Sequence, residues 1–264
     1  MKASEIINEL FALSGWESEK TCDTIKSGSP DAAVTKVAVS MFATPEVVKN
    51  AHEWGAELLI VHEPTYYNHM DEHSDEAIET EKRRFIESTG ITICRFHDHP
   101  HYTFPDVICE GEMKYMKLDG DISYTGTFDQ VRVHLHKPTT PRELARQIEE
   151  NTGIAHIRIC GAADTPCTEV TGMFGTPGGV FEELKREGSE IVMTGEACEW
   201  ALGEYARDAA QLGHRKALLI LGHIGSERDG MKLTAERLAK AHPELGVRYF
   251  ECGEVYTYTD SKII

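Results

Sequence analysis

The chain lacks any hydrophobic stretch long enough to cross a bilayer. A transmembrane helix needs about 20 consecutive apolar residues, and no apolar run in these 264 residues approaches that length. The opening segment MKASEIINELFALSGWESE has acidic residues among its apolar ones, which is unlike a secretory signal peptide. We therefore predict a cytoplasmic protein with no membrane partner.

Regularly spaced cysteines are also absent. The seven cysteines are scattered and form no CxxC pair (Cys22, Cys94, Cys109, Cys160, Cys167, Cys198 and Cys252). A disulfide framework or a zinc ribbon depends on regular spacing, so the pattern supports neither. Reduced thiols in a cytoplasmic protein fit it better.

Basic side chains are few compared with acidic ones. Lysine and arginine together number 27 against 44 aspartates and glutamates, which gives a formal net charge of −17. Nucleic acids and anionic membranes are bound by clusters of lysine and arginine, so a nucleic-acid partner is not expected. The glycine-rich segment GTPGG at 175–179 lacks the lysine of a P-loop, so the sequence shows no obvious phosphate-cradling loop.

The chain does contain an internal repeat. Residues 37–63 read VAVSMFATPEVVKNAHEWGAELLIVHE, and residues 170–196 read VTGMFGTPGGVFEELKREGSEIVMTGE. Each copy has a strand-like start, then Met-Phe, a small residue, Thr-Pro, a stretch of helical period, an apolar strand and a closing glutamate. The matching positions are Met41/Met173, Phe42/Phe174, Thr44/Thr176, Pro45/Pro177, Glu57/Glu190 and Glu63/Glu196.

Each copy predicts a strand–turn–helix–strand unit. Thr-Pro suits a helix start, with threonine as the cap, and Gly55 and Gly188 stand where a helix C-cap is expected. Such units build a parallel or mixed sheet covered by helices, so we predict an α/β fold made from a duplicated module. Ahead of it, apolar residues from Ile6 to Leu13 recur at helical spacing and predict an amphipathic helix capped by Ser4.

Ligand-type side chains follow four predicted strands. In open α/β sheets, ligands bind at the carboxyl ends of strands, so equivalent strand ends would bring these side chains into one cleft. Imidazole and carboxylate groups together suit transition metals. The four strand exits carry His62 and Glu63; His97, Asp98, His99 and His101; Thr194 and Glu196; and His223 and Glu227.

Two of these pairs also have ordinary structural explanations. His62 and Glu63 could be a simple loop pair. His223 and Glu227 could be a helix cap with an acid in the first turn, favoured by the helix dipole. If a helix starts near Ser226, His223 and Glu227 can face the same side of it. Their occurrence at the ends of repeated strands favours a metal site.

Four segments resemble the signatures of a known family. GHIGSE at 222–227 resembles its GHxxSE signature, and MTGE at 193–196 its strand-ending TG-acid motif. IVHEPTYY at 60–67 and FHDHPH at 96–101 resemble its first motif and its HxxxD motif. The family comprises dinuclear metal-centre proteins related to NGG-interacting factor three, often called GTP cyclohydrolase I type 2 homologues. The resemblance implies two intertwined α/β repeats with mixed sheets, residues 1–112 with the N-terminal helix and residues 113–264. It also implies a metal site between the repeats and a toroidal homohexamer.

The resemblance implies a ligand set with two departures from the family pattern. Glu63 stands where the family commonly has a second histidine, and His101 stands where it has an aspartate. The total of four histidines and two carboxylates is unchanged. We therefore interpret the two departures as compensating for each other, since one replaces a histidine by a carboxylate and the other a carboxylate by a histidine. Which carboxylate bridges the metals, and whether Asp98 or His99 is a ligand, stays open. The expected ligands are His62, Glu63, His97, His101, His223 and Glu227, holding two divalent ions of Zn, Fe, Mn, Co or Ni.

The leading hypothesis is a metal-dependent hydrolase that acts on a small, heterocyclic or phosphorylated substrate through a metal-bridging hydroxide. Glu227 would bridge the ions. Glu196 ends the equivalent strand without an adjacent histidine, so it is the candidate for an orienting residue or general base. The alternative is a non-enzymatic metal store, chaperone or regulatory scaffold. A mononuclear hydrolase of the β-lactamase kind would need HxHxDH order, which FHDHPH does not supply.

Overall fold

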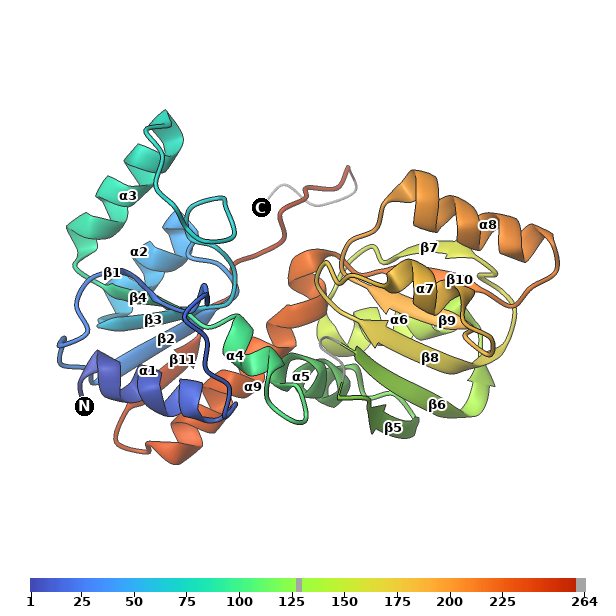
Figure 1. Ribbon diagram of the computed structural model, residues 1–264, viewed down its shortest axis with the longest axis horizontal. Helices are drawn as coiled ribbons and strands as arrows, with labels where there is room; N and C mark the ends of the chain where they lie inside the picture. The colour runs from blue at the N-terminus through green and yellow to red at the C-terminus, as the bar shows by residue number, and fades with distance from the viewer. Residues whose placement is uncertain (127–129, 260–264) are drawn as a thin grey trace. The chain divides into compact units, whose positions relative to one another are not determined.

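The computed structural model describes residues 1–126 and 130–259. It has a mixed α/β fold with two mixed sheets, as predicted (Figure 1). The chain forms two compact units, each built from separate segments, so the units are intertwined along the sequence. The first unit contains Met1–Ile7, Lys20–His97 and the chain from Leu238 onward, and the second contains Asn8–Glu19 and Asp98–Arg237. The boundary predicted after residue 112 separates the two sequence repeats and not these two compact units, and it stays a prediction.

The first unit contains a five-stranded sheet. The strand order is β1-β4-β3-β2-β11, in which β1 is antiparallel to β4 and the other neighbours are parallel. The apolar side chains of the two helices α2 and α3 bury against this sheet, in a cluster that includes Val48 and Ile86. The elements are β1 (Ile25–Ser27), β2 (Lys36–Ser40), α2 (Pro45–Trp54), β3 (Leu58–Val61), α3 (Ala77–Thr89), β4 (Thr92–Arg95) and β11 (Gly246–Tyr249).

The second unit contains a six-stranded sheet in the order β5-β6-β8-β9-β10-β7. The strands β8, β9 and β10 are parallel, and the outer pairings are antiparallel. The strands are β5 (Gly120–Tyr124), β6 (Gln130–Thr139), β7 (Arg158–Gly161), β8 (Cys167–Met173), β9 (Ile191–Thr194) and β10 (Ala217–Ile220). The helices are α4 (Asp98–His101), α5 (Val107–Met116), α6 (Pro141–Thr152), α7 (Val180–Lys185), a π-helical turn (Glu199–Gly203) and α8 (Glu204–Gln211).

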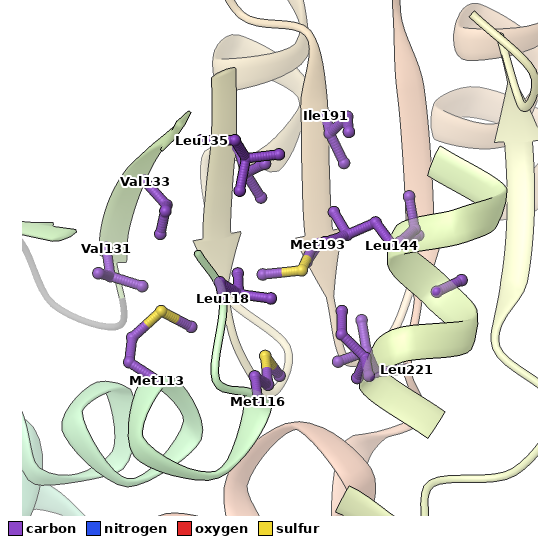
Figure 2. Packing of buried hydrophobic residues seen from close by; sticks show 14 of the residues in the cluster. Met113, Met116, Leu118, Val131, Val133, Leu135, Leu144, Ile191, Met193 and Leu221 are labelled. Carbon is purple, nitrogen blue, oxygen red and sulfur yellow. The ribbon is translucent and has the colours of Figure 1, made fainter. Parts of the chain in front are cut away.

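One hydrophobic cluster of the second unit lies between this sheet and the helices α5 and α6, and another lies between the sheet and the helices α7 and α8. Figure 2 shows Met113 and Met116 of α5 and Leu144 of α6 packed against side chains such as Val133 and Met193 of the sheet. Burying each such side chain contributes about 1.5–3 kcal/mol. Side chains alternate along β6, since His134 and His136 are exposed while Val133 and Leu135 are buried.

Two helices continue from one unit into the other. The N-terminal helix α1 (Ala3–Ala12) is present as predicted, with Ile6, Ile7 and Leu10 buried. The prediction that Ser4 caps it is wrong, because the helix begins at Ala3. The C-terminal helix α9 spans His223–Ala241. No helix in the described ranges is both long and apolar enough to span a membrane.

The sequence repeat is a structural repeat. The segments β2-α2-β3-α3-β4 and β8-α7-β9-α8-β10 follow the same order, and their first two strands pair in the same parallel register. Thr44 caps α2 as predicted, and Gly55 ends it in the left-handed conformation. In the second copy the predicted Thr-Pro start is wrong: Gly179 has φ +85°, which a helix cannot contain, so α7 begins at Val180.

The paired glutamates of the repeat make the same contact. Glu57 Oε2 accepts hydrogen bonds from the backbone N–H groups of Thr35 and Lys36, at 3.1 and 2.9 Å. Glu190 Oε2 accepts from the backbone N–H groups of Thr168 and Glu169, near the start of β8, at 2.7 and 3.1 Å. Each carboxylate therefore holds the start of the neighbouring strand, which gives these matched positions a structural role.

Candidate metal centre

The first group of predicted ligands begins where β3 ends. The N–H groups of His62 and Glu63 both donate to the carbonyl oxygen of Met41, at 3.1 and 2.9 Å, which turns the chain sharply after the strand. His62 Nδ1 lies 3.0 Å from the carbonyl oxygen of Phe96. Because a carbonyl can only accept, Nδ1 carries the hydrogen, and Nε2 is the atom that can bind a metal ion.

His97 joins this group from the end of the adjacent parallel strand. Its ring centroid lies 4.7 Å from that of His62, and the two planes differ by 28°. Ligand atoms of His62 lie within 4.8 Å of one on His97 and of one on Glu63. The backbone N–H of His97 donates to Asp23 Oδ1 at 2.6 Å, which holds the strand exit in place. The first unit thus brings its three predicted ligands together.

A buried arginine that was not predicted from the sequence supports this group. Arg95 has no exposed surface; its Nε donates to the carbonyl oxygen of His62 at 3.0 Å, and Nη1 donates to that of His69. Its guanidinium also lies 4.0 Å from the Glu63 carboxylate and 3.6 Å from Asp71. An arginine within the apolar strand TICR was the available signal, because a buried arginine requires charged or carbonyl partners.

Two further ligand-type side chains lie close by. His69 is exposed, and its ring lies 5.5 Å from that of His97 in an edge-on arrangement. A ligand atom of His69 also lies within 4.8 Å of the Cys22 thiol, which is buried. Sequence spacing gave no indication of this pair, because Cys22 precedes the first strand and His69 follows the third.

The second unit brings together His223, Glu227 and Glu196. Helix α9 begins at His223 itself, three residues before the predicted start near Ser226. His223 Nε2 lies 3.1 Å from Glu227 Oε2, and Nδ1 lies 2.8 Å from Glu196 Oε1. Nδ1 also lies 3.1 Å from the Thr176 hydroxyl oxygen. Glu196 therefore contacts Nδ1 of His223, the ring nitrogen on the side away from Glu227. This is the position of a residue that orients the imidazole.

A glycine makes room for Glu227. Gly175 of the repeated Met-Phe-small-Thr-Pro segment has φ +65°, and a Cβ there would lie 2.2 Å from Glu227 Oε1. Its N–H donates to the Ser226 hydroxyl at 2.9 Å. The small residue of the motif thus places the backbone directly against the carboxylate.

His101 ends the short helix α4 and is held by an acid outside the predicted set. His101 Nδ1 lies 3.0 Å from Asp106 Oδ2. The other carboxylate oxygen of Asp106 caps α5 by accepting from the N–H groups of Ile108 and Cys109, at 2.8 and 3.2 Å. Burial alone would raise the pKa of Asp106, but the charge and hydrogen bond of His101 and these amides bring it below its ordinary value.

His99, between the predicted ligands, packs against aromatic rings. Its ring stacks on Phe11 with centroids 4.1 Å apart and planes 9° apart, and it meets Trp16 edge-on at 5.2 Å. Trp16 in turn stacks on Tyr102 at 4.2 Å. These contacts give His99 a packing role on α4.

The donor chemistry of both groups fits a transition-metal ion. His62, His101 and His223 each have Nδ1 next to an oxygen acceptor, so Nε2 is the atom that could bind a metal ion; metal-binding histidines in proteins almost always have such a partner. The acceptors Phe96 and Asp106 were not predicted. Imidazole and carboxylate oxygen together suit Zn, Fe, Mn, Co and Ni.

Comparison with known proteins shows that nearly the whole chain matches one protein family. The Duf34/NIF3 (NGG1p interacting factor 3) family matches residues 1–254. A protein of Clostridium perfringens (strain 13 / Type A) named GTP cyclohydrolase 1 type 2 homolog is 22% identical over 235 residues, covering 86% of this chain and 87% of that protein.

Solved structures share the fold. The protein ybgI, described as of unknown function, has a TM-score of 0.74 at 19% identity, over 96% of this chain and 99% of that one. The Staphylococcus aureus protein SA1388 has the same TM-score at 16% identity, over 100% of this chain and 99% of that one. At these sequence identities the similarity establishes only the fold. Any chemical activity must be inferred from the side chains of this chain.

Proposed function

Because the chain belongs to the Duf34/NIF3 family, we propose that it binds two divalent transition-metal ions and hydrolyses a small molecule with them. The observation that carries the proposal is the orientation of three histidines, each held at Nδ1 by an oxygen acceptor. The exposed His134 also pairs its Nδ1 with a carboxylate, that of Glu169. His62 and His101 instead make this contact while buried, and ligand atoms of His97 and Glu63 lie within 4.8 Å of His62, which suits the fixed ring direction that a metal ion requires.

The proposed ligands are the six residues expected from the sequence. His62, Glu63 and His97 come from the first unit, and His101, His223 and Glu227 come from the second. The Arg95 guanidinium, 4.0 Å from Glu63, favours the charged carboxylate that a metal ligand needs. Glu227 is the proposed bridging carboxylate.

Bound divalent ions would supply Lewis acidity, lowering the pKa of water and polarising a carbonyl or phosphoryl oxygen. Glu196 holds the proton on His223 Nδ1 and so fixes the direction of Nε2. Its side chain is 55% exposed, so the same carboxylate can also reach solvent and exchange a proton there. We propose Glu196 as the residue that orients His223 and transfers protons.

The proposed substrate is small and carries little negative charge. The net charge of −17 repels polyanions at long range, and no excess of basic residues offsets it. We further propose that the protein works in the cytoplasm as a homohexamer, as the family resemblance implies. Light scattering coupled to size-exclusion chromatography tests the assembly, and a mass of one or two chains would contradict it.

The experiment that tests the function is metal content per chain, measured by mass spectrometry after purification without chelators. Wild type is expected to hold about two ions per chain, the number of a two-metal hydrolytic site, and Glu227→Ala is expected to lose them. The control is His134→Ala, which removes an exposed histidine that pairs with Glu169 on the sheet of the second unit. About one ion or none in wild type, unchanged in Glu227→Ala, would overturn the dinuclear proposal.

A hydrolase and a metal store give different results in one further assay. Metal-loaded wild type should hydrolyse at least one compound from a panel of small esters, amides and cyclic amidines, and Glu196→Gln should lose that activity while keeping its metal. A store would release its ions to a competing chelator within minutes and turn over none of the panel.

A further inference from the structure

A pocket of about 190 Å³ lies beside His101 in the second unit. Its walls come from α4, from the connection to α5 and from the strands β5 and β6 with the segments next to them. We call it the His101 pocket. Its described lining consists of His101, Tyr102, Thr103, Phe104, Asp106, Tyr124, Gly126 and Gln130.

Aromatic rings form much of this lining. Tyr102 is held by stacking on Trp16, with centroids 4.2 Å apart and planes 4° apart. Phe104 is 74% exposed, an unusual position for a large apolar ring. A Cβ on Gly126 would lie 3.9 Å from its Cε2 atom, so the phenyl ring sits over a backbone without a side chain. Tyr124 of β5 adds a third ring.

The polar groups of the pocket favour a ligand without negative charge. Of the described residues that line it, none is a lysine or an arginine. Asp106 contributes a carboxylate that is already bonded to His101. The Thr103 hydroxyl is engaged with two backbone carbonyls, at 2.6 and 2.8 Å. Gln130 Oε1 lies 3.2 Å from the Thr125 hydroxyl, which leaves its amide N–H₂ as the donor for a ring acceptor.

The size of the pocket suits a flat molecule of one or two rings. An apolar cavity of about 150 Å³ is large enough to hold benzene, and the His101 pocket is somewhat larger at about 190 Å³. Aromatic walls favour planar ligands, because stacking on a π-face adds to the burial of apolar area. Among the described lining residues, a phosphate would meet the Asp106 carboxylate and neither a lysine nor an arginine.

We propose that the His101 pocket binds the planar, uncharged heteroaromatic ring of the substrate. This inference rests on the proposed function in one respect: His101 is a proposed metal ligand, so a ring held here would lie next to the metal ions. The affinity of the pocket for a ring is independent of metal. It would make the substrate a heteroaromatic compound whose hydrolysable bond lies close to its ring.

The test uses 2-aminopurine, a fluorescent heteroaromatic base that loses emission when it stacks on another ring. It is titrated with the full chain as purified, and fluorescence and anisotropy are recorded. We expect quenching and a rise in anisotropy that saturate together. Phe104→Ala should bind about tenfold more weakly, since one aromatic stacking contact contributes a factor of this order. Phe104→Tyr, which keeps the ring, should bind like wild type.

The matched control is Trp200→Ala. Trp200 is 82% exposed and does not line the pocket, so its removal should leave binding unchanged. The ribonucleoside monophosphate of 2-aminopurine should bind no more tightly than the base, and cyclohexanol should not compete. Absence of saturable binding, equal binding by wild type and Phe104→Ala, or full competition by cyclohexanol would each overturn the proposal.

The metal content of the same samples separates this inference from the proposed function. Saturable 2-aminopurine binding to a chain that holds no metal would support ring binding in the His101 pocket and reject the dinuclear proposal. Two ions per chain without any 2-aminopurine binding would reject the pocket alone.

Discussion

Arg95 Nε donates a hydrogen bond of 3.0 Å to the carbonyl oxygen of His62, from a side chain with no exposed surface. The same guanidinium contacts Asp71, which in turn lies 3.2 Å from Lys26. The backbone that carries His62 and Glu63 is therefore held by a buried network of charged side chains. These contacts, all made within the first unit, set the position of this backbone.

Replacing Arg95 by methionine should destabilise the fold strongly. The substitution leaves the carbonyl oxygens of His62 and His69 without their donor and removes one of the two cations near Asp71. Removing one partner from a buried charged pair costs about 3–5 kcal/mol. Urea denaturation measures the loss.

The control for Arg95→Met is Arg142→Met, which breaks a pair with Asp164 whose side chains are 47% and 73% exposed. An exposed pair contributes about 0–1 kcal/mol, so this variant should unfold close to wild type. Equal effects from the two substitutions would show that the Arg95 network does not support the strand exit.

The second prediction concerns Gly175. Alanine there would combine a left-handed φ of +65° with a Cβ 2.2 Å from Glu227 Oε1. The carboxylate must move, so Gly175→Ala should lower both stability and metal content. Gly213→Ala is the matched control, because its φ is +88° and nothing lies within 4 Å of the added Cβ.

Gly213→Ala should show the backbone strain alone, about 1–2 kcal/mol, with metal content unchanged. Thermal unfolding and metal analysis of both variants measure the difference. If Gly175→Ala kept its metal as well as Gly213→Ala does, the tight contact with Glu227 would have no role in the site.

Much of the fold could be predicted from the sequence because the repeat carries its own signals. Apolar strands, the Thr-Pro start at Thr44 and the C-cap Gly55 all indicate the structure that forms. The same Thr-Pro signal failed in the second copy because Gly178 and Gly179 follow it, and α7 starts only after them. A local pattern predicts well until a neighbouring residue imposes a different backbone angle.

The supporting residues of the site could be predicted less well. The position of Asp106 as a helix cap could have been predicted, because an aspartate directly before the helical run VICEGEM is a typical N-cap signal. The Phe96 carbonyl that orients His62 and the Asp23 carboxylate that holds His97 come from other parts of the chain. Contacts of this kind depend on how strands pair, and residue types alone do not indicate them.

The third prediction is a pH dependence at Glu57. Burial raises the pKa of this carboxyl, but hydrogen bonds from Lys36 and Thr35 outweigh burial and bring it below the ordinary value of 4.5. The folded state therefore binds the proton less readily than the unfolded state. The resulting stabilisation is complete above pH 4.5 and is lost as the pH falls through the folded-state pKa.

Glu57→Gln should therefore be less stable than wild type at neutral pH, and the difference should vanish in acid. Urea midpoints of both proteins, from about pH 7 to about pH 3, measure it. Glu53→Gln, on the exposed face of α2, is the control and should follow wild type throughout. A difference that stays constant with pH would mean that the Glu57 charge does not matter.

The fourth prediction separates the role of Glu196 from that of Glu227. Both carboxylates contact His223, Glu196 at Nδ1 and Glu227 at Nε2. In Glu196→Gln, an amide oxygen can still accept from Nδ1, so the ring keeps its direction but loses the neighbouring charge. Metal content at saturating concentrations should be intact, with an affinity about tenfold lower or more.

Glu227→Ala removes a ligand atom instead, and its metal should not return at any practical concentration. Titration with Zn²⁺ in the presence of a competing chelator gives both affinities. If Glu196→Gln lost its metal as completely as Glu227→Ala, Glu196 would itself be a ligand. The nitrogen that binds the ion would then be Nδ1 of His223, and Glu227 at Nε2 would be the residue that orients the ring.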